Sequence, residues 1–163
     1  MLGPRTGFPV VIVGCGRLGS ALLHYREFEK EGIQVVAGFD ANPARVDRAA
    51  TPPVLPFEEL ADFVQSNEIE VGVIAVPDDA ASDVFETMLG AGVRGFLNFT
   101  TVQLKCAGRC EQENCPRQCT IENVNFGLQI ENLFYMITFQ KPENRVLSLE
   151  ELKEKHQRRF GTA

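Results

Sequence analysis

The sequence lacks the features that would direct a chain to nucleic acid, to a membrane or to secretion. Lysine and arginine number 16 against 22 acidic residues, and the formal net charge of -6 argues against unaided binding to DNA or an acidic membrane. No uninterrupted apolar stretch reaches the roughly 20 residues that a membrane helix requires. The first residues, MLGPRTG, lack the apolar core of a secretion signal. We therefore expect a cytoplasmic protein that contacts neither membrane nor nucleic acid by itself.

Histidine is also scarce, and the chain offers no convincing catalytic acid or base. Only His24 and His156 are present, the first in a predicted helix and the second in a charged tail. Catalytic hydride transfer needs a substrate site and usually a positioned acid or base. We therefore assign no catalytic residue, expect a protein that is not an enzyme, and rank a self-sufficient dehydrogenase last among the possible functions.

What the sequence does contain is the alternation of an α/β fold. Its 163 residues, 44% hydrophobic and 23% charged, suit one ordinary core. Apolar runs predict strands, and apolar residues at helical spacing predict helices between them. The predicted strands are Val10–Val13, Ile33–Phe39, a short edge strand within Pro52–Pro56, Ile69–Val76, Gly95–Phe99 and Thr120–Val124, and the predicted helices are Leu18–Phe28, Phe57–Val64 and Asp78–Met88. Strands that alternate with helices predict a Rossmann-type, doubly wound, mostly parallel sheet.

A glycine pattern follows the first predicted strand and opens the first predicted helix. Gly14, Gly16 and Gly19 have the spacing of a dinucleotide-binding turn, and Asp40 follows 21 residues after Gly19 at the end of the next strand. Such glycines allow the tight turn, the approach of backbone to a pyrophosphate, and close packing of helix on strand. The free N–H groups of the turn and the helix start, including Arg17 and Leu18, would hold the phosphates.

The acidic residue selects among nucleotides. Asp40 would accept hydrogen bonds from the adenosine ribose and would repel a 2′-phosphate, which favours NAD(H) over NADP(H). Arg45 lies nearby in sequence and weakens this preference. The alternatives are that the domain binds another nucleotide, such as coenzyme A, or no nucleotide. Cys15, inside the turn, is interpreted as a small residue that fills space.

Four of the five cysteines crowd into a polar insert at residues 105–119. Cys106, Cys110, Cys115 and Cys119 have the spacing C-x3-C-x4-C-x3-C. Four thiolates from one loop can surround zinc or an iron–sulfur cluster, although zinc usually favours C-x2-C pairs. The alternatives are two reversible disulfides or free thiols. We predict a metal or cluster site without choosing between zinc and iron–sulfur.

The chain ends in two helices of different character. Residues 127–140 are apolar on nearly every side, so the helix must be buried all round, and we predict that it packs between two subunits of a homodimer. Ser148 to Glu151 form a capping box that opens a charged amphipathic helix to about Phe160. We expect residues 1–140 to form the nucleotide-binding domain and residues 141–163 a helical tail with a possible protein partner.

With these motifs in hand, the stretch from about Val10 to Phe139 resembles the nicotinamide-binding domain of the Rex family of redox-sensing transcriptional repressors. The matching segments are VIVGCGRLGSALLHY at residues 11–25, FDANP at 39–43, IAVP at 74–77, AGVRGFLNFT at 91–100 and ENVNF at 122–126. The resemblance implies a homodimer with an exchanged C-terminal helix, in which NADH binding closes the dimer and releases DNA.

The resemblance also assigns residues to the nicotinamide end of the site. It implies that Val76 and Pro77 line the nicotinamide side, with Asn98, Phe99 and Thr100 at the end of the next strand. It further implies that Tyr25 and Phe126 pack near the nicotinamide across the dimer.

Three departures from the family pattern qualify this expectation. Only nine residues precede Val10, too few for the winged-helix DNA-binding domain of the family, and Asn125 stands where the family usually has aspartate. The family has a short apolar connection where this chain has its cysteines. We therefore favour an NAD(H)-binding redox sensor whose occupancy controls a dimer or partner, and keep an NAD(H)-binding iron–sulfur electron-transfer subunit as the alternative.

Overall fold

The computed structural model describes residues 7–105, 118–140, 153–154 and 156–157. The chain divides into two compact units, Met1–Asn125 and Phe126–Ala163. The predicted boundary at residue 140 adjoins residues outside the described part, so the domain division at that point stays a prediction.

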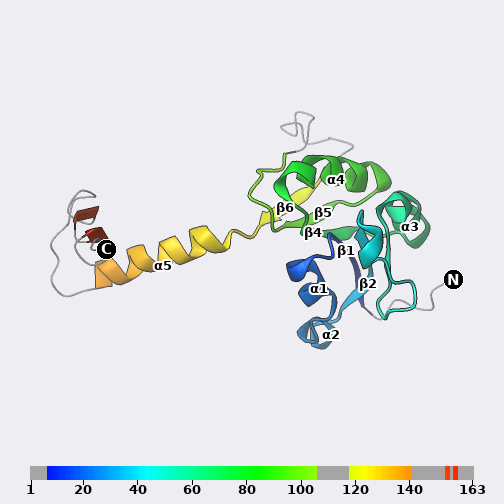
Figure 1. Ribbon diagram of the computed structural model, residues 1–163, viewed down its shortest axis with the longest axis horizontal. Coiled ribbons are helices and arrows are strands. Elements are labelled where there is room, and N and C mark those ends of the chain that lie inside the picture. Colours follow the sequence, from blue (N-terminus) through cyan, green and yellow to red (C-terminus); the bar gives the residue numbers. More distant parts are fainter. Residues whose placement is uncertain (1–6, 106–117, 141–152, 155, 158–163) are drawn as a thin grey trace. The chain divides into compact units, whose positions relative to one another are not determined.

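The first unit is built on a six-stranded parallel sheet (Figure 1). Its spatial order is β3-β2-β1-β4-β5-β6, and every neighbouring pair is parallel. The strands are β1 (Phe8–Val13), β2 (Ile33–Asp40), β3 (Val54–Pro56), β4 (Val71–Ile74), β5 (Gly95–Asn98) and β6 (Thr120–Asn123). The first strand therefore lies in the interior of the sheet, as its uninterrupted β-branched sequence predicts for a strand covered on both faces.

Helices cover both faces of this sheet. The helices are α1 (Arg17–Leu23), α2 (Glu27–Lys30), α3 (Leu60–Asn67) and α4 (Asp78–Ala91), with short 3₁₀ turns at Pro43–Arg45 and Phe57–Glu59. Figure 1 shows α1 and α2 on one side of the sheet and α3 and α4 on the other. The predicted doubly wound α/β fold is confirmed.

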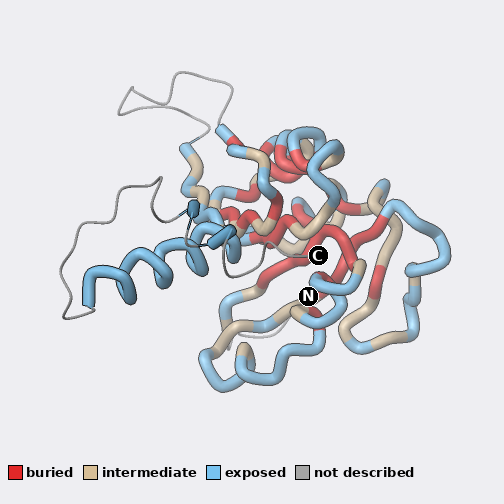
Figure 2. Tube along the Cα trace, turned by 60° about the vertical axis from the view of Figure 1, so that its left-hand side comes forward, coloured by how far each residue is buried: buried red, intermediate tan, exposed pale blue. Residues whose placement is uncertain are grey.

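Two apolar clusters lie on the two faces of the sheet, and buried residues concentrate along the strands and the inner sides of the helices (Figure 2). The larger cluster joins Val11, Val13 and Phe39 of the sheet to buried residues of α3 and α4. The smaller one joins Val10 and Ile12 to Leu23 of α1. Alternate residues of β1 thus face opposite clusters, as the two-residue period of a strand requires.

The first predicted helix differs from the structure. One helix was expected from Leu18 to Phe28, but α1 ends at Leu23 and α2 begins at Glu27. The N–H of Tyr25 donates to the carbonyl of Leu22, three residues back, at 3.2 Å. This tightened last turn ends the α-helical hydrogen-bond series early.

The second unit contains helix α5 (Phe126–Gln140), close to its predicted bounds. None of its residues is buried within this single chain. Within the described part, no helix is long and apolar enough to cross a membrane. The predicted capping box lies outside the described residues, of which the tail contributes only 153–154 and 156–157, all helical.

Candidate nucleotide-binding crevice

The sequence-predicted site residues gather at the carboxyl ends of the central strands. Residues Gly14–Gly19 follow β1, Asp40 ends β2, Val76 and Pro77 follow β4, and Asn98–Thr100 follow or end β5. Because β2 and β4 flank β1 on opposite sides, the connections diverge at this point. In open α/β sheets, the crevice outside such a switch point is where ligands bind.

Two of the three glycines are required by the backbone around them. Gly14 has a φ of +93°, and a Cβ there would lie 2.4 Å from the carbonyl oxygen of Ala75. A Cβ on Gly19 would lie 1.7 Å from the carbonyl oxygen of Gly14. The turn is therefore packed against the end of β4 on one side and against α1 on the other, and neither position has room for a side chain.

Gly16 differs from its neighbours because it faces open space. A Cβ there would meet no atom within 4 Å, apart from its own chain neighbours. Gly16 is also the N-cap of α1 and has no side-chain capping bond. Arg17 and Leu18, which begin the helix, are exposed. Backbone N–H groups at this helix start are thus open to a ligand, as the first N–H groups of any helix lack intrahelical partners.

Asp40 ties the end of β2 to the glycine turn. Its carboxylate accepts from the N–H of Cys15 and from the N–H of Asn42, both at 2.8 Å. The Nη1 atom of Arg45 lies 3.4 Å from the same carboxylate, whose side chain is only 7% exposed. A carboxylate has about four acceptor positions, so the group keeps capacity for a further donor such as a hydroxyl.

Cys15 is a buried part of the turn. Its thiol packs against Gly38, where an added Cβ would lie 2.7 Å from the sulfur. Burial, and secondly the charge of Asp40, raise the pKa of Cys15 from 9.0 to about 11. At neutral pH this cysteine is a protonated thiol, the form that lacks nucleophilic character, which agrees with its interpretation as a space-filling residue.

The second wall of the crevice begins where β4 ends. Val76 is half-buried, and its Cγ1 would lie 2.9 Å from a Cβ on Gly14. Pro77 is exposed and is the N-cap of α4. The structure thus places Val76 beside Gly14, and Pro77 follows it at the start of α4.

The wall continues at the end of β5, where Asn98 is almost completely buried and Phe99 is half-buried. The side-chain oxygen of Asn98 accepts from the N–H and the hydroxyl of Thr100 at 3.0 and 2.8 Å. Its amide nitrogen donates to Val102 and to Asn123, both at 2.9 Å. Two donors and two acceptor positions are all that a primary amide has, so Asn98 shapes the wall and its own amide is fully used.

Two exposed residues, Thr101 and Asp78, are hydrogen-bonded to each other on the outer side of the loop that follows β5. The N–H of Thr101 donates to Oδ1 of Asp78 at 3.0 Å, and its hydroxyl donates to Oδ2. These hydrogen bonds hold the pKa of Asp78 below its ordinary value of 3.8, and the bond from the Thr101 hydroxyl has the largest effect. The loop after β5 is thereby joined to the first turn of α4.

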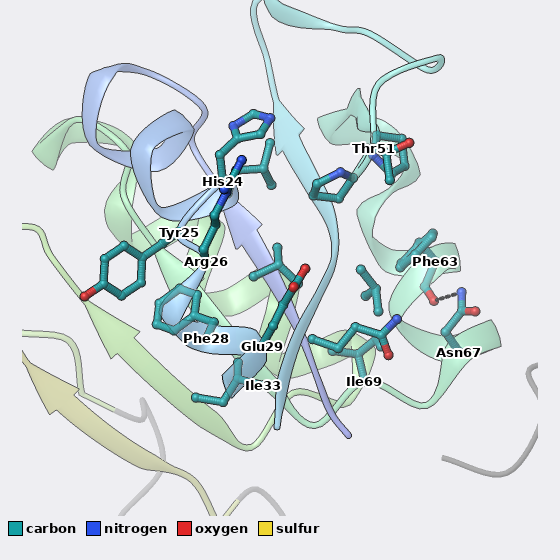
Figure 3. Close-up of a pocket in the computed structure, with 16 residues that line it drawn as sticks. His24, Tyr25, Arg26, Phe28, Glu29, Ile33, Thr51, Phe63, Asn67 and Ile69 are labelled. Atoms are coloured by element: carbon teal, nitrogen blue, oxygen red, sulfur yellow. Dashed lines mark hydrogen bonds between the residues drawn. The ribbon is translucent and has the colours of Figure 1, made fainter. Parts of the chain in front are cut away.

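Tyr25 and Phe126 are not brought to the glycine turn by contacts within one unit. Tyr25 is half exposed and packs edge-to-face on Phe28, with ring centroids 5.0 Å apart. It lines a hollow of about 790 Å³ beside β2, between α2 and α3 (Figure 3). Phe126 opens α5 in the second unit and is 58% exposed. Their proposed place near a nicotinamide stays a prediction.

The predicted metal ligands fall mostly outside the described residues. Three of the four, Cys106, Cys110 and Cys115, lie outside the described residues. Only Cys119 is described, and it is half-buried. Among the described residues, no three His, Cys, Asp or Glu side chains are grouped to hold a metal ion.

Three further residues of the crevice wall, Asn123, Asp78 and Thr101, are not among the site residues predicted from the sequence. Asn98 and Asn123 are the last residues of neighbouring strands and lie directly opposite in the register, which the sequence by itself does not give. No local pattern marks the Asp78–Thr101 pair, whose members are 23 residues apart.

The fold and the glycine turn define a Rossmann-type nucleotide-binding domain. Residues 8–102, more than half of the chain, match the family described as the CoA binding domain, and the chain belongs to that family.

Within this class the resemblance to the Rex family is confirmed. The chain is 34% identical over 142 residues to the redox-sensing transcriptional repressor Rex of Desulforamulus reducens, which covers 86% of this chain and 63% of that protein. The crystal structure of RSP, a Rex-family repressor, in complex with beta-NADH is 27% identical, with a TM-score of 0.69 over 92% of this chain and 64% of that one. RSP with beta-NAD+ and operator DNA gives 26% identity and a TM-score of 0.70 over 94% and 63%. The chain thus spans less than two thirds of these relatives.

Proposed function

We propose that this chain binds NAD(H) in the crevice and acts as a redox sensor whose occupancy controls a dimer or a protein partner. The observation that carries the proposal is the contrast among the three glycines. Gly14 and Gly19 are packed against backbone, while Gly16, between them, opens onto free space beside the start of α1. A turn that is rigid on both sides and open at its middle suits a pyrophosphate held by backbone N–H groups.

Asp40 supports the choice of nucleotide. Its carboxylate is held in place by backbone N–H groups, including that of Cys15 in the turn, and retains acceptor capacity for a ribose hydroxyl. A ribose that carries a phosphate, as in NADPH or coenzyme A, would bring a second anion to this carboxylate. The related repressor RSP has been solved in complex with beta-NADH and with beta-NAD+, which agrees with this preference.

Calorimetric titration with NADH, NAD+, NADPH and coenzyme A tests the proposal. We expect micromolar or tighter binding of at least one of NADH and NAD+, and at least about tenfold weaker binding of NADPH and coenzyme A. Equal binding of NADPH would refute the role given to Asp40, and binding of coenzyme A alone would replace the proposed ligand.

A matched pair of variants tests the location. Gly16→Val and Gly90→Val each add a branched side chain where a Cβ meets nothing within 4 Å. The first fills the proposed phosphate position, whereas Gly90 lies in α4, away from the turn. We expect Gly16→Val to abolish nucleotide binding in a folded protein and Gly90→Val to keep it. Retained affinity in Gly16→Val would place the ligand elsewhere.

The dimer is proposed from the second unit. Helix α5 exposes a continuous set of large apolar side chains, with Phe134 68% and Phe139 74% exposed. Monomeric proteins rarely leave such a surface in water. The partner that we propose is a second copy of this chain. Sedimentation should show a dimer that dissociates in Phe134→Asp, and a wild-type monomer at tens of micromolar would refute this part of the proposal.

A metal or cluster at Cys106, Cys110, Cys115 and Cys119 is proposed from their sequence spacing alone. Metal analysis of anaerobically purified protein should find about one zinc ion or cluster per chain, lost when two of these cysteines become serine. Iron with visible absorbance would favour the electron-transfer alternative. Metal-free protein with full nucleotide binding would dismiss the site.

A further inference from the structure

The buried amide of Asn98 joins two segments of the crevice wall that are separate in sequence, the end of β5 with the loop after it and the end of β6. It belongs to β5, accepts twice from Thr100, and donates to Val102 and to Asn123 of β6. Asn98 is 1% exposed, so water cannot replace these partners. The wall after β5 is therefore held from inside by one side chain.

Backbone bonds fix Asn98 itself between its neighbouring strands. The N–H of Phe99 donates to the carbonyl of Ile74 in β4 at 3.0 Å, and the N–H of Val124 donates to the carbonyl of Asn98 at 2.9 Å. The loop that Asn98 holds is joined on its outer side to Asp78 through Thr101. The segment from Asn98 to Val102 is thus braced on both sides and can hold a fixed shape.

This braced segment lies on the side of the glycine turn opposite to Asp40. Strands β2 and β4 flank β1, and β5 lies beyond β4. A dinucleotide with its adenosine ribose at Asp40 and its phosphates at Gly16 extends across β1 toward β4 and β5. The half of the ligand that reaches the braced wall is then the nicotinamide half.

We infer that Asn98 and Asn123 form a positioning pair that fixes the wall for the nicotinamide half of the ligand and leaves the adenosine half unaffected. The inference rests on the proposed function, because it requires a dinucleotide in the crevice. Asn123 supplies the acceptor that completes the bonding of the Asn98 amide. Without that acceptor, one buried N–H donor of Asn98 lacks its partner, and the amide loses the bond that fixes its orientation.

The test uses Asn123, because its exposed position allows substitution with little risk to folding. Asn123→Leu removes the acceptor at similar size, and Asn123→Asp keeps an oxygen that accepts from Asn98. Calorimetry with NADH and with ADP-ribose, which lacks the nicotinamide, separates the two halves of the site. For Asn123→Leu we expect about tenfold weaker NADH binding, which corresponds to about 1.4 kcal/mol, and less than twofold weaker ADP-ribose binding.

The conservative variant is the control for the pair. Asn123→Asp should restore the NADH affinity to within about threefold of wild type, since the hydrogen bond is kept. Equal weakening of both ligands by Asn123→Leu, or no weakening of either, would overturn the inference, and so would equal affinity of the wild type for NADH and ADP-ribose. Wild-type protein that binds neither ligand would instead refute the proposed function, so the two failures are distinguishable.

Discussion

Helices α4 and α5 have similar lengths and opposite surroundings. Helix α4, with 14 residues, buries six of them against the sheet and α3, whereas α5, with 15 residues, buries none within the single chain. Yet α5 is the more apolar of the two, since only Glu131 among its residues is charged. The apolar content of a helix therefore indicates how much of its surface must be buried. It does not indicate whether the surface that covers it belongs to the same chain or to another.

The unit that contains α4 is tightly packed at its glycine turn, so the smallest added side chain there should disrupt it. In Gly19→Ala the new Cβ would overlap the carbonyl oxygen of Gly14, at 1.7 Å. Because that oxygen belongs to backbone within the turn, we expect a loss of at least about 4 kcal/mol of unfolding free energy, the range of severe core disruption. Urea denaturation followed by circular dichroism measures it.

Gly90→Ala is the matched control within α4. A Cβ there meets nothing within 4 Å, and alanine is the better helix former by roughly 1 kcal/mol. We expect this variant to be slightly more stable than wild type. A Gly19→Ala protein as stable as wild type would show that the turn is not packed as described.

The second prediction compares equivalent methionines of the two helices. Met88 in α4 is completely buried, and Met136 in α5 is 60% exposed. Met88→Ala should cost about 2–5 kcal/mol of unfolding free energy through lost contacts and a cavity. Met136→Ala should cost less than about 0.5 kcal/mol at concentrations where the chain is monomeric.

The effects of the two methionine substitutions should depend differently on protein concentration. If α5 is covered by a second copy, Met136→Ala should weaken dimerisation and so lower the melting temperature of concentrated samples, while Met88→Ala should destabilise at every concentration. A concentration-independent cost of several kcal/mol for Met136→Ala would mean that the helix is buried within its own chain.

The fold and the glycine turn could be predicted because their signals are local. A buried strand, the spacing of Gly14, Gly16 and Gly19, and a carboxylate at the next strand end are all readable within about 30 residues. The break after Leu23 was missed, since helical spacing continues through Tyr25 and Phe28 while the hydrogen bonds do not.

The second wall could not be predicted in the same way. Asn98 and Asn123 are 25 residues apart and meet only because β5 and β6 pair in register. A polar residue at a strand end has many possible roles, and the pairing decides among them. The bond that Asp40 accepts from the N–H of Cys15, 25 residues away, likewise forms only when β1 and β2 are placed side by side.

The third prediction concerns the thiol packed inside the glycine turn. A rise of the pKa of Cys15 from 9.0 to about 11 leaves about a hundredfold less thiolate at pH 8 than in an unfolded chain. Alkylation of Cys15 by iodoacetamide should therefore be at least about a hundredfold slower in the folded protein than in urea, as followed by peptide mass spectrometry.

The sign of the pH dependence follows from the same shift. Because the folded-state pKa is raised, the stability contributed by the protonated thiol is complete below pH 9 and is lost as the pH rises toward 11. Cys15→Ala should remove this part of the alkaline loss. Equal alkylation rates in folded and unfolded protein would show that the turn opens readily.

The last prediction concerns the way in which the first turn of α4 is held by the loop after β5. Thr101→Val removes the hydroxyl that donates to Asp78, the main cause of the lowered pKa of that carboxyl group. The pKa of Asp78 should then rise toward 3.8 without reaching it, because the carboxylate still accepts from the N–H of residue 101. Carboxyl ¹³C NMR titration measures the change, and Thr87→Val, which removes a hydroxyl bonded to a backbone carbonyl of the same helix, should leave Asp78 unaffected.

A lowered folded-state pKa contributes stability above about pH 4 that is lost as the pH falls through it, so the wild type should lose slightly more stability than Thr101→Val on acidification. An unchanged Asp78 pKa in Thr101→Val would mean that the hydroxyl does not join the loop after β5 to α4 in solution.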